Sequence, residues 1–413
     1  YVRWTANRNM QAFLDLLAQG KLDVPRLITH RFPFSEAVSV FDKVSTGELA
    51  HAVGLVFEYP EPEKGVFGIQ PRTLMFGGDR PRGKLRLGQI GAGNYAKSML
   101  MPCFSSLENL SLEGICTTRG ANAEALARRY GFRKATTDAW QLLRDPEINA
   151  IMVATRHDSH AQYAAAALEA GRHVYVEKPL AMSEDEIEPI ITALATRGKD
   201  APTLWIGYNR RFSLLSQRAN DHMKDVGLRQ VTCIVRSAGV PADSWYQDEL
   251  EGGGILFGDV CHYIDLAVHF VQSLPVEVSA FATSDNGHRE EGWAITIRFV
   301  NGSLGVVHYT CGSQQGLKGE AIEILGGGRS AQITGFRRLV LHGGPGGGVR
   351  LFQPDRGQKA MLQAMAAQFS GTPGATDYTE SFLVSAQTLL AVKRSIAERR
   401  IVSIEPRFPF RIG

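Results

Sequence analysis

Lys178 stands directly before a proline, at the end of the apolar run HVYV at 173–176. An ammonium at the rim of a buried parallel sheet is partly removed from water, so we expect its pKa to be lowered. Such a lysine can donate a proton to a substrate oxygen or orient it, which makes Lys178 the first candidate catalytic residue. The alternative is a surface lysine in front of a helix that begins at Pro179. The Lys-Pro bond also tolerates the cis form.

A second set of reactive side chains lies in the stretch EGGGILFGDVCHYIDLAVHF. Asp259, His262 and Asp265 recur every three residues, so we expect them to share one helix face and to form a polar pocket. Asp259 and His262 are taken as catalytic and substrate-binding candidates. A histidine with two carboxylates can also hold zinc, but no second histidine or cysteine stands at ligand spacing. We therefore predict no metal.

A glycine pattern in LRLGQIGAGNYAKSML has the spacing Gly91-x-Gly93-x-x-Ala96. In dinucleotide-binding folds the first glycine permits a tight turn, the second lets the backbone approach a pyrophosphate, and the small third residue allows close helix packing. The helix that begins at Asn94 and Tyr95 offers free amide donors to the phosphates. The pattern alone also fits a simple helix-start turn. The strand before it, with the helix and second strand after it, favours a dinucleotide site.

The end of that second strand, in EGICTTRG, indicates which dinucleotide is preferred. An acid there usually binds the adenosine ribose hydroxyls of NAD and repels the 2′-phosphate of NADP. Glu113 stands in mid-strand and is expected to point off one face of the sheet. The strand ends with Thr117, Thr118 and Arg119, which can donate hydrogen bonds and a positive charge to a phosphate. We predict NADP as the preferred cofactor and NAD as the second choice, with a solvated loop arginine as the alternative for Arg119.

Further cofactor contacts are expected where the next strands end. The carboxyl edge of an open α/β sheet is where ligands bind. This position favours cofactor contacts from five residues: Thr155, Arg156, His160, Glu177 and Lys178. His160 could equally cap or pack the helix that follows it.

Substrate contacts are predicted farther along the chain. GYNRRF follows the last predicted parallel strand, and SWYQDELEGGG leads into the helix of His262. Asn209, Arg210 and Tyr246 are therefore taken as substrate-binding candidates.

These residues need elements that bring them together. From Lys84 onward, apolar runs alternate with helical patterns up to the run APTLWIGYN. Strands separated by helices predict a doubly wound parallel sheet, which is the Rossmann arrangement. After about Arg210 the strands are longer and alternate in polarity, and FVNGSL contains an Asn-Gly turn typical of a hairpin. The fold class is therefore α/β: a Rossmann domain followed by an α/β domain with a large, mainly antiparallel open sheet. Helices are expected in that second domain near 213–225, 254–270 and 378–399.

Changes in composition and periodicity along the chain predict its domain organisation. Residues 1–60 show a helix, an extended piece, a second helix and a strand, and 61–83 are rich in Gly, Pro and charge, as in a linker. The remaining boundaries are 84–209 for the Rossmann domain, 210–406 for the second domain and 407–413 for a tail.

Composition limits the classes of partner and the cellular location that we expect for the protein. The 413 residues are 44% hydrophobic and 21% charged, with a formal charge of +3 and no basic stripe. Neither nucleic acid nor an anionic membrane is implied as a partner, and a small molecule is the default ligand. The five cysteines lie far apart without a CxxC pair, which fits a reducing, cytoplasmic location. No membrane span or signal peptide is evident. Because the first residue is Tyr1 rather than Met, we expect the natural chain to begin earlier.

Together, GQIGAGNYA, EKPLAM, GYNRRF and the GGG-to-His stretch resemble the Gfo/Idh/MocA oxidoreductases, over about residues 84–406. The resemblance implies that Lys178 is catalytic, that His262 works beside it on the substrate oxygen, and that the open sheet forms a homo-oligomer interface. It also shows one departure. The family often has an acid four residues before this histidine, where this chain has Gly258. Asp259, in the next position, either compensates or faces away.

Residues 9–44, NMQAFLDLLAQGKLDVPRLITHRFPFSEAVSVFDKV, resemble the tail of a medium-chain alcohol dehydrogenase. The resemblance implies a bi-domain oxidoreductase whose medium-chain half is mostly missing here. It also implies a sugar or nucleotide-sugar substrate.

The main hypothesis is an NAD(P)-dependent oxidoreductase that acts on a sugar, polyol or nucleotide-sugar. The rival hypothesis is a non-catalytic dinucleotide sensor or regulatory subunit on the same fold, and the presence of both Lys178 and His262 favours the enzyme. A third hypothesis, a passive partner of the missing half, is disfavoured by the intact glycine loop.

Overall fold

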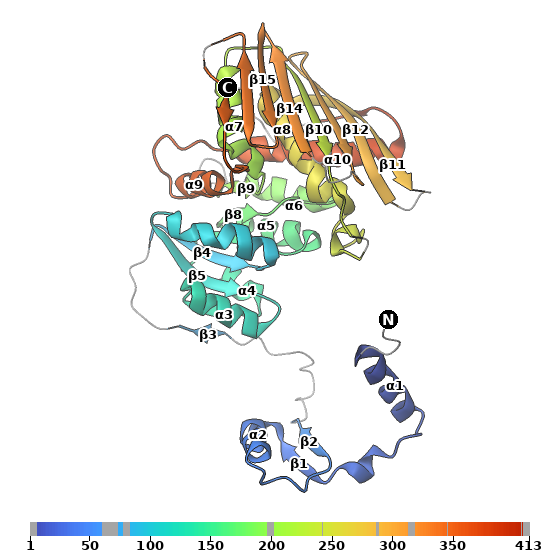
Figure 1. Cartoon of the computed structure of the whole chain (residues 1–413). Helices are drawn as coiled ribbons and strands as arrows, with labels where there is room; N and C mark the ends of the chain where they lie inside the picture. Colours follow the sequence, from blue (N-terminus) through green and yellow to red (C-terminus); the bar gives the residue numbers. More distant parts are fainter. Residues whose placement is uncertain are drawn as a thin grey trace. The chain divides into compact units, whose positions relative to one another are not determined.

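The computed structural model describes residues 6–59, 73–76, 83–195, 202–241, 243–285, 289–312, 319–344, 346–405 and 407. The chain divides into two compact units, 1–70 and 71–413, and each is described by itself (Figure 1). Most of the predicted linker and of the predicted C-terminal tail lies outside the described residues.

The N-terminal unit follows the predicted order of elements. Its helices are α1 (Ala6–Ala18) and α2 (Ala37–Ser45), and its strands β1 (His30–Pro33) and β2 (Leu55–Glu58) pair in parallel. Among the described residues of this unit, Val40 is the one buried apolar side chain. The unit therefore has almost no core of its own.

The first domain of the second unit is the predicted Rossmann domain. Among the described residues its sheet has seven strands in the order β3-β6-β5-β4-β7-β8-β9. The strand order reverses between β4 and β7, which makes their carboxyl ends the ligand-binding edge. The strands are β3 (Leu74–Met75), β4 (Leu85–Ile90), β5 (Leu110–Cys116), β6 (Lys134–Thr136), β7 (Ala150–Val153), β8 (His173–Val176) and β9 (Leu204–Ile206). The helices are α3 (Gly120–Tyr130), α4 (Ala139–Leu143), α5 (His160–Glu169) and α6 (Glu184–Ala195).

Part of the predicted linker belongs to this sheet. Leu74 and Met75 form β3, which pairs antiparallel with Ala135 and Lys134 of β6. The Gly- and Pro-rich surroundings hide a strand this short in the sequence. The linker prediction is therefore wrong at 74–75.

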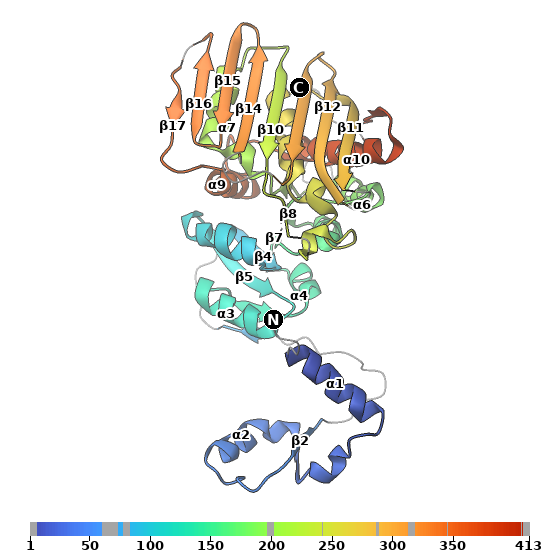
Figure 2. The same ribbon diagram turned by 45° about the vertical axis from the view of Figure 1, so that its right-hand side comes forward.

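The second domain carries the predicted large sheet. Its described strands follow the order β17-β16-β15-β14-β10-β13-β12-β11-β18, and all neighbours are antiparallel except β10 and β13 (Figure 2). The predicted Asn-Gly hairpin joins β12 to β13, with Gly302 at φ +83°. The strands are β10 (Gln230–Arg236), β11 (Pro275–Asp285), β12 (Arg289–Phe299), β13 (Leu304–Thr310), β14 (Gly319–Gly326), β15 (Arg329–Thr334), β16 (Arg338–His342), β17 (Val349–Arg350) and β18 (Val402–Ser403).

Helices cover one face of this sheet. The packed helices are α7 (Leu214–His222), α8 (Cys261–Val271) and α10 (Thr379–Glu398), close to the predicted positions, while α9 (Gln358–Phe369) contacts the segment 96–106 of the Rossmann domain. A π-helical turn, Leu256–Val260, leads into α8. The opposite face of the sheet carries no helix among the described residues (Figures 1 and 2).

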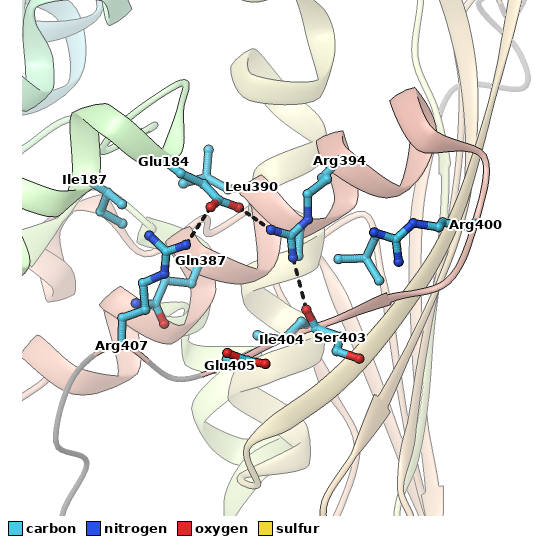
Figure 3. Close-up of a pocket in the computed structure, with 12 residues that line it drawn as sticks. Glu184, Ile187, Gln387, Leu390, Arg394, Arg400, Ser403, Ile404, Glu405 and Arg407 are labelled. Carbon is cyan, nitrogen blue, oxygen red and sulfur yellow. Dashed lines mark hydrogen bonds and ion pairs between the residues drawn. The ribbon is translucent and has the colours of Figure 1, made fainter.

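Ion pairs join the two domains beside a cavity of about 290 Å³. Glu184 at the start of α6 binds Arg394 of α10 at 2.8 Å and Arg407 at 2.7 Å (Figure 3). Arg394 also donates to the carbonyl of Ser403 in β18. These contacts hold α6 of the Rossmann domain against α10 and β18 of the second domain.

Candidate active site

A cleft of about 960 Å³ runs along the carboxyl ends of β4, β7 and β8 and is closed by residues of the second domain. Nearly all of the predicted site residues line it. They are Gly91, Gly93, Asn94, Tyr95, Ala96, Thr117, Thr118, Thr155, Arg156, His160, Glu177, Lys178, Asn209, Arg210, Tyr246, Asp259 and His262. Arg119 is the predicted residue that does not line the cleft. It precedes α3 with an exposed side chain.

The glycine loop has the geometry that dinucleotide binding requires. Gly91 has φ +82°, and a Cβ there would lie 2.5 Å from the carbonyl oxygen of Ala154. A Cβ on Gly93 would meet nothing within 4 Å. Gly91 therefore serves the turn itself, while Gly93 leaves open space in the cleft.

The segment 116–119 at the end of β5 contains no carboxylate, although Asp138 after the neighbouring β6 contributes to raising the pKa of the Cys116 thiol. Glu113 is buried in mid-strand and pairs with Arg133 at 3.3 Å, so it points away from the strand end as expected. Thr117 donates to the carbonyl of Arg119, and Thr118 lines the cleft beside Asn122. Lys97 donates to the Asn122 side chain at 3.1 Å, which places an ammonium next to this end of the cleft.

Lys178 connects the two domains inside the cleft. Its Nζ donates to the carbonyl oxygen of Gly258 at 2.5 Å and lies 5.5 Å from the ring centre of Tyr246. Only 8% of the residue is exposed, and its bond to Pro179 is cis.

The predicted lowering of the Lys178 pKa is wrong. Burial lowers that pKa, but the nearby Tyr246, Cys261, Glu177 and Asp259 raise it, and the net shift is upward. The prediction considered desolvation without the acidic side chains that lie around the ammonium. Lys178 is therefore a cation at neutral pH.

Glu177 is enclosed behind Lys178. Its carboxylate accepts hydrogen bonds from the Tyr175 hydroxyl at 2.5 Å and from the Lys178 backbone amide at 3.3 Å. A Cβ on Gly207 would lie 2.8 Å from the Glu177 carboxylate, so only glycine leaves room for it there. Burial raises the pKa of Glu177.

His262 lines the same cleft as Lys178, but the two side chains differ in charge. Burial, with Arg210 and Lys178 nearby, lowers the pKa of His262 well below its usual value, so the ring is neutral. Its Nδ1 is enclosed and has no hydrogen-bond partner among the described residues. A neutral histidine ring carries one proton, so its other nitrogen can accept a proton.

His160 lines the cleft but also has a structural role. Its Nδ1 lies 2.7 Å from the Pro179 carbonyl and its Nε2 lies 3.3 Å from the Thr155 carbonyl. Burial lowers its pKa to about 4. The alternative of a packed histidine therefore fits its contacts.

Asp259 does not turn away from the cleft. Its carboxylate accepts from the Tyr309 hydroxyl at 2.6 Å and pairs with Arg210 at 3.2 Å. Glu320 in turn pairs with Arg210 at 3.2 Å and with Arg356 at 3.0 Å. These residues form a continuous network of paired charges at the end of the cleft where the substrate is predicted to bind.

Asp265 does not join this pocket, so the prediction of three polar groups on one face is wrong. Six residues of an α-helix turn through about 600°, which carries Asp265 away from the face of Asp259. The π-helical turn that contains Asp259 shifts it further. Asp265 instead pairs with Arg211 in the core, where both side chains are 1% exposed.

Several residues that line the cleft were not predicted from the sequence. His157 stands between the predicted Arg156 and His160, and its Nδ1 lies 2.7 Å from the Gly252 carbonyl. Arg356 and Gln358 come from the segment before α9, far from every motif, and no local pattern marks them. The other missed side chains are Asn122, Asp158, Ser159, Tyr163 and Trp245.

Among the described residues, no group of three or more His, Cys, Asp or Glu side chains is placed to hold a metal ion. No helix in the described part of the chain is long and apolar enough to cross a membrane. All five cysteines are free thiols.

Comparison with known proteins decides the family. A family model described as the NAD-binding Rossmann fold of the GFO_IDH_MocA oxidoreductases matches residues 85–203, and one described as the GFO/IDH/MocA C-terminal domain matches residues 227–332. Together they cover more than half of the chain. The chain belongs to the GFO/IDH/MocA oxidoreductase family. For residues 1–60 the alcohol-dehydrogenase resemblance stays a prediction.

Individual relatives agree with this family. The D-glucoside 3-dehydrogenase of Escherichia coli (strain K12) is 29% identical over 205 residues, which are 48% of this chain and 57% of that protein. An uncharacterized oxidoreductase of Bacillus subtilis (strain 168) is 29% identical over 261 residues, 60% of this chain and 74% of that protein. The match to the first relative therefore spans little more than half of its length.

Solved structures show the same fold. Levoglucosan dehydrogenase in complex with NADH and levoglucosan superposes with a TM-score of 0.67 at 21% identity. The superposition covers 78% of this chain and 100% of that one.

Proposed function

We propose that this GFO/IDH/MocA protein is an NAD(P)-dependent oxidoreductase that transfers a hydride between nicotinamide and a hydroxyl or carbonyl carbon of a sugar, polyol or nucleotide-sugar. One observation carries the proposal. Lys178 and His262, from different domains, both line the cleft that begins at the glycine loop, and Lys178 is close enough to help lower the His262 pKa. The relatives named above as glucoside and levoglucosan dehydrogenases support the substrate class.

The residues present fit a dinucleotide. The open space at Gly93 and the amides of the following helical turn suit a pyrophosphate. When bound, the nicotinamide supplies the hydride acceptor or donor. Lys178, as a cation, donates a hydrogen bond to the substrate oxygen and stabilises negative charge on it. Neutral His262 takes the hydroxyl proton during oxidation and returns it during reduction. Because Nδ1 is enclosed, we assign this exchange to Nε2.

The reacting end favours an uncharged group. Arg210 and Arg356 are paired with Asp259 and Glu320, and Lys178 lies beside Glu177. Each arginine of this network is already paired with a carboxylate, and the Nη1 of Arg210, which has no hydrogen-bond partner among the described residues, can be satisfied by a neutral oxygen. We therefore propose that a neutral, hydroxylated carbon binds here, and that any nucleotide part of a nucleotide-sugar extends beyond this network.

For the cofactor we propose NADP before NAD. The end of β5 offers Thr118, Asn122 and the neighbouring Lys97, and Glu113 of the same strand is already paired. Hydroxyl, amide and ammonium groups suit a 2′-phosphate. The NADH in the levoglucosan dehydrogenase structure is that protein's cofactor. Substitution of Thr118 or Lys97 by Ala should lower affinity for NADPH more than for NADH. An unchanged ratio of the two dissociation constants would contradict the NADP proposal.

The experiment that tests the function is a screen of sugars and polyols with each dinucleotide, followed by the absorbance of the reduced nicotinamide. We expect Lys178→Ala to lower kcat by about 100-fold or more while dinucleotide affinity stays nearly unchanged. The matched control is Lys224→Ala, because Lys224 is an exposed lysine outside the cleft. Dinucleotide binding without turnover of any compound would favour the non-catalytic sensor. The cytoplasmic location, the homo-oligomer and the missing medium-chain half also stay proposals.

A further inference from the structure

The ring of Tyr246 lies directly on Gly258. A Cβ at position 258 would be 2.3 Å from both Cδ1 and Cε1 of that ring. Real Cβ atoms do not approach other atoms so closely, so any side chain at 258 would force the ring out of place. The absence of a side chain there admits Tyr246 to the cleft.

The same two residues surround the ammonium of Lys178. Its Nζ donates to the Gly258 carbonyl at 2.5 Å and lies 5.5 Å from the Tyr246 ring centre. Tyr246 lines the cleft, where its side chain is half-buried. An accessible phenol beside a buried ammonium provides a second donor for one oxygen atom.

The fold holds this ring firmly. The Trp245 and His157 rings pack against it at centroid distances of 4.4 and 5.2 Å. Gly252 admits the backbone of Tyr246, since a Cβ there would lie 2.6 Å from its Cα. His157 is bonded to the Gly252 carbonyl, which ties this loop to the Rossmann domain.

We infer that Tyr246 is a catalytic residue that binds the substrate oxygen together with Lys178, and that Gly258 is glycine so that the ring can reach it. The inference rests on the proposed function. In the oxidation direction the C–H bond breaks and its electron pair leaves as hydride to the nicotinamide, while the hydroxyl proton passes to His262 and a carbonyl forms. Tyr246 and Lys178 each donate a hydrogen bond to that oxygen, and neither loses its proton.

The first test removes only the hydroxyl. Tyr246→Phe keeps the ring over Gly258 and should lower kcat by about 10- to 100-fold while dinucleotide affinity changes less than about threefold. Tyr130→Phe, on α3 outside the cleft, is the matched control and should leave kcat unchanged. If Tyr246→Phe retains the wild-type kcat on a substrate that Lys178→Ala no longer turns over, Tyr246 only packs and the inference is wrong. If the wild type turns over no sugar or polyol, the proposed function itself fails.

The second test uses Gly258 and does not depend on turnover. Gly258→Ala should lower the melting temperature by a few degrees, and Tyr246→Ala in the same chain should remove that loss. With substrate, the Gly258→Ala and Tyr246→Phe losses in kcat should not multiply in the double variant, because both remove one contact. A Gly258→Ala protein with wild-type melting temperature and kcat would overturn the inference.

Discussion

Lys178 and His262, which both line the cleft, are held in different charge states, one a cation and the other neutral. Tyr246, Cys261, Glu177 and Asp259 raise the pKa of Lys178, while burial lowers that of His262. Desolvation acts on both, but only the lysine has enough acidic side chains beside it to reverse the shift. The arrangement provides one cation and one proton acceptor at the same pH, as the proposed hydride transfer needs.

The buried histidines should make the fold sensitive to acid. Burial lowers the pKa of His157 to about 2 and that of His160 to about 4, whereas the unfolded chain takes up these protons near pH 6.5. Below pH 6.5 the unfolded state binds more protons, so the free energy of unfolding falls as the pH falls, by about 1.4 kcal/mol per pH unit for each histidine. The contribution is complete above pH 6.5. Urea unfolding at a series of pH values measures this slope.

Two variants separate this effect from general acid denaturation. His157→Gln should reduce the slope by about one proton, while His51→Gln, at an exposed histidine, should leave it unchanged. Equal slopes for the wild type and His157→Gln would contradict the prediction.

The residue types of the site could be predicted, but their electrostatics could not. Lys178 and His262 stand at motif positions, and strand ends of a parallel sheet must share an edge. The direction of the Lys178 pKa depends on Asp259 and Tyr246, which only tertiary structure brings close. Arg356 shows the same limit, since nothing in its local sequence connects it to a cleft formed mainly by earlier segments.

At the scale of elements, both halves of the cleft begin at a π-helical turn. One turn, Ala96–Leu100, follows the glycine loop, and the other, Leu256–Val260, carries Gly258 and Asp259. A π-turn changes the direction of the side chains that follow it. The three-residue spacing therefore predicted the helix correctly and the orientation of Asp265 incorrectly.

The two glycines of the loop should respond differently to the same substitution. Gly91→Ala places a side chain at φ +82° and against the Ala154 carbonyl, so we expect a loss of about 2–4 kcal/mol in unfolding free energy. Gly93→Ala meets no atom within 4 Å and should change stability by less than about 0.5 kcal/mol. Its methyl group instead enters the proposed pyrophosphate path and should weaken dinucleotide binding about tenfold or more. Urea unfolding and fluorescence titration distinguish the two, and a Gly93→Ala protein with normal affinity would contradict the proposed path.

Removing one partner of the buried ion pair between Arg211 and Asp265 should lower the free energy of unfolding strongly. It joins the segment after β9 to α8, and Arg211 also donates to Ser381 of α10. Asp265→Ala leaves an uncompensated buried charge and should cost about 3–5 kcal/mol by urea unfolding. The double change Arg211→Met with Asp265→Leu should recover most of the loss.

The exposed pair of Asp23 and Arg26 serves as the control. Asp23→Ala should cost less than about 1 kcal/mol, because water screens this pair. An equal loss for the two aspartates would contradict the role assigned to burial.

At the scale of the whole molecule, the face of the nine-stranded sheet away from the helices is open among the described residues. One continuous row of outward side chains crosses it, formed by Phe281, Ala294, His308, Ile234 and Ala321. Phe281 is 67% exposed and Ile234 is 38% exposed. Such a surface suits a second copy of the chain, as the family resemblance implies.

We predict that this face forms the homo-oligomer. Ile234→Glu puts a charge at the centre of the row and should lower the mass in solution, measured by light scattering. Val300→Glu, at an exposed position on the β12–β13 turn, is the control and should leave the mass unchanged. A mass that Ile234→Glu does not alter would place the interface elsewhere or show a monomer.

Domain order, sheet types and most helices could be read from the sequence, because strand–helix alternation and the Asn-Gly turn are local signals. Strand order in the second sheet could not. β10 pairs in parallel with β13 and antiparallel with β14, and both partners come much later in the chain.

The place of β10 has a consequence for how the protein is made. As the first strand of its sheet to leave the ribosome, β10 lies between two strands that follow about 70 and 80 residues later. The second domain therefore cannot complete its centre until most of it has been synthesised, whereas the sheet of the Rossmann domain uses strands already available. Even that sheet is completed late, because Thr379 of α10 bonds to both backbone groups of Leu204 in its edge strand β9. Growing chains that end before α10 should thus expose the cofactor domain's edge to chaperones and proteases.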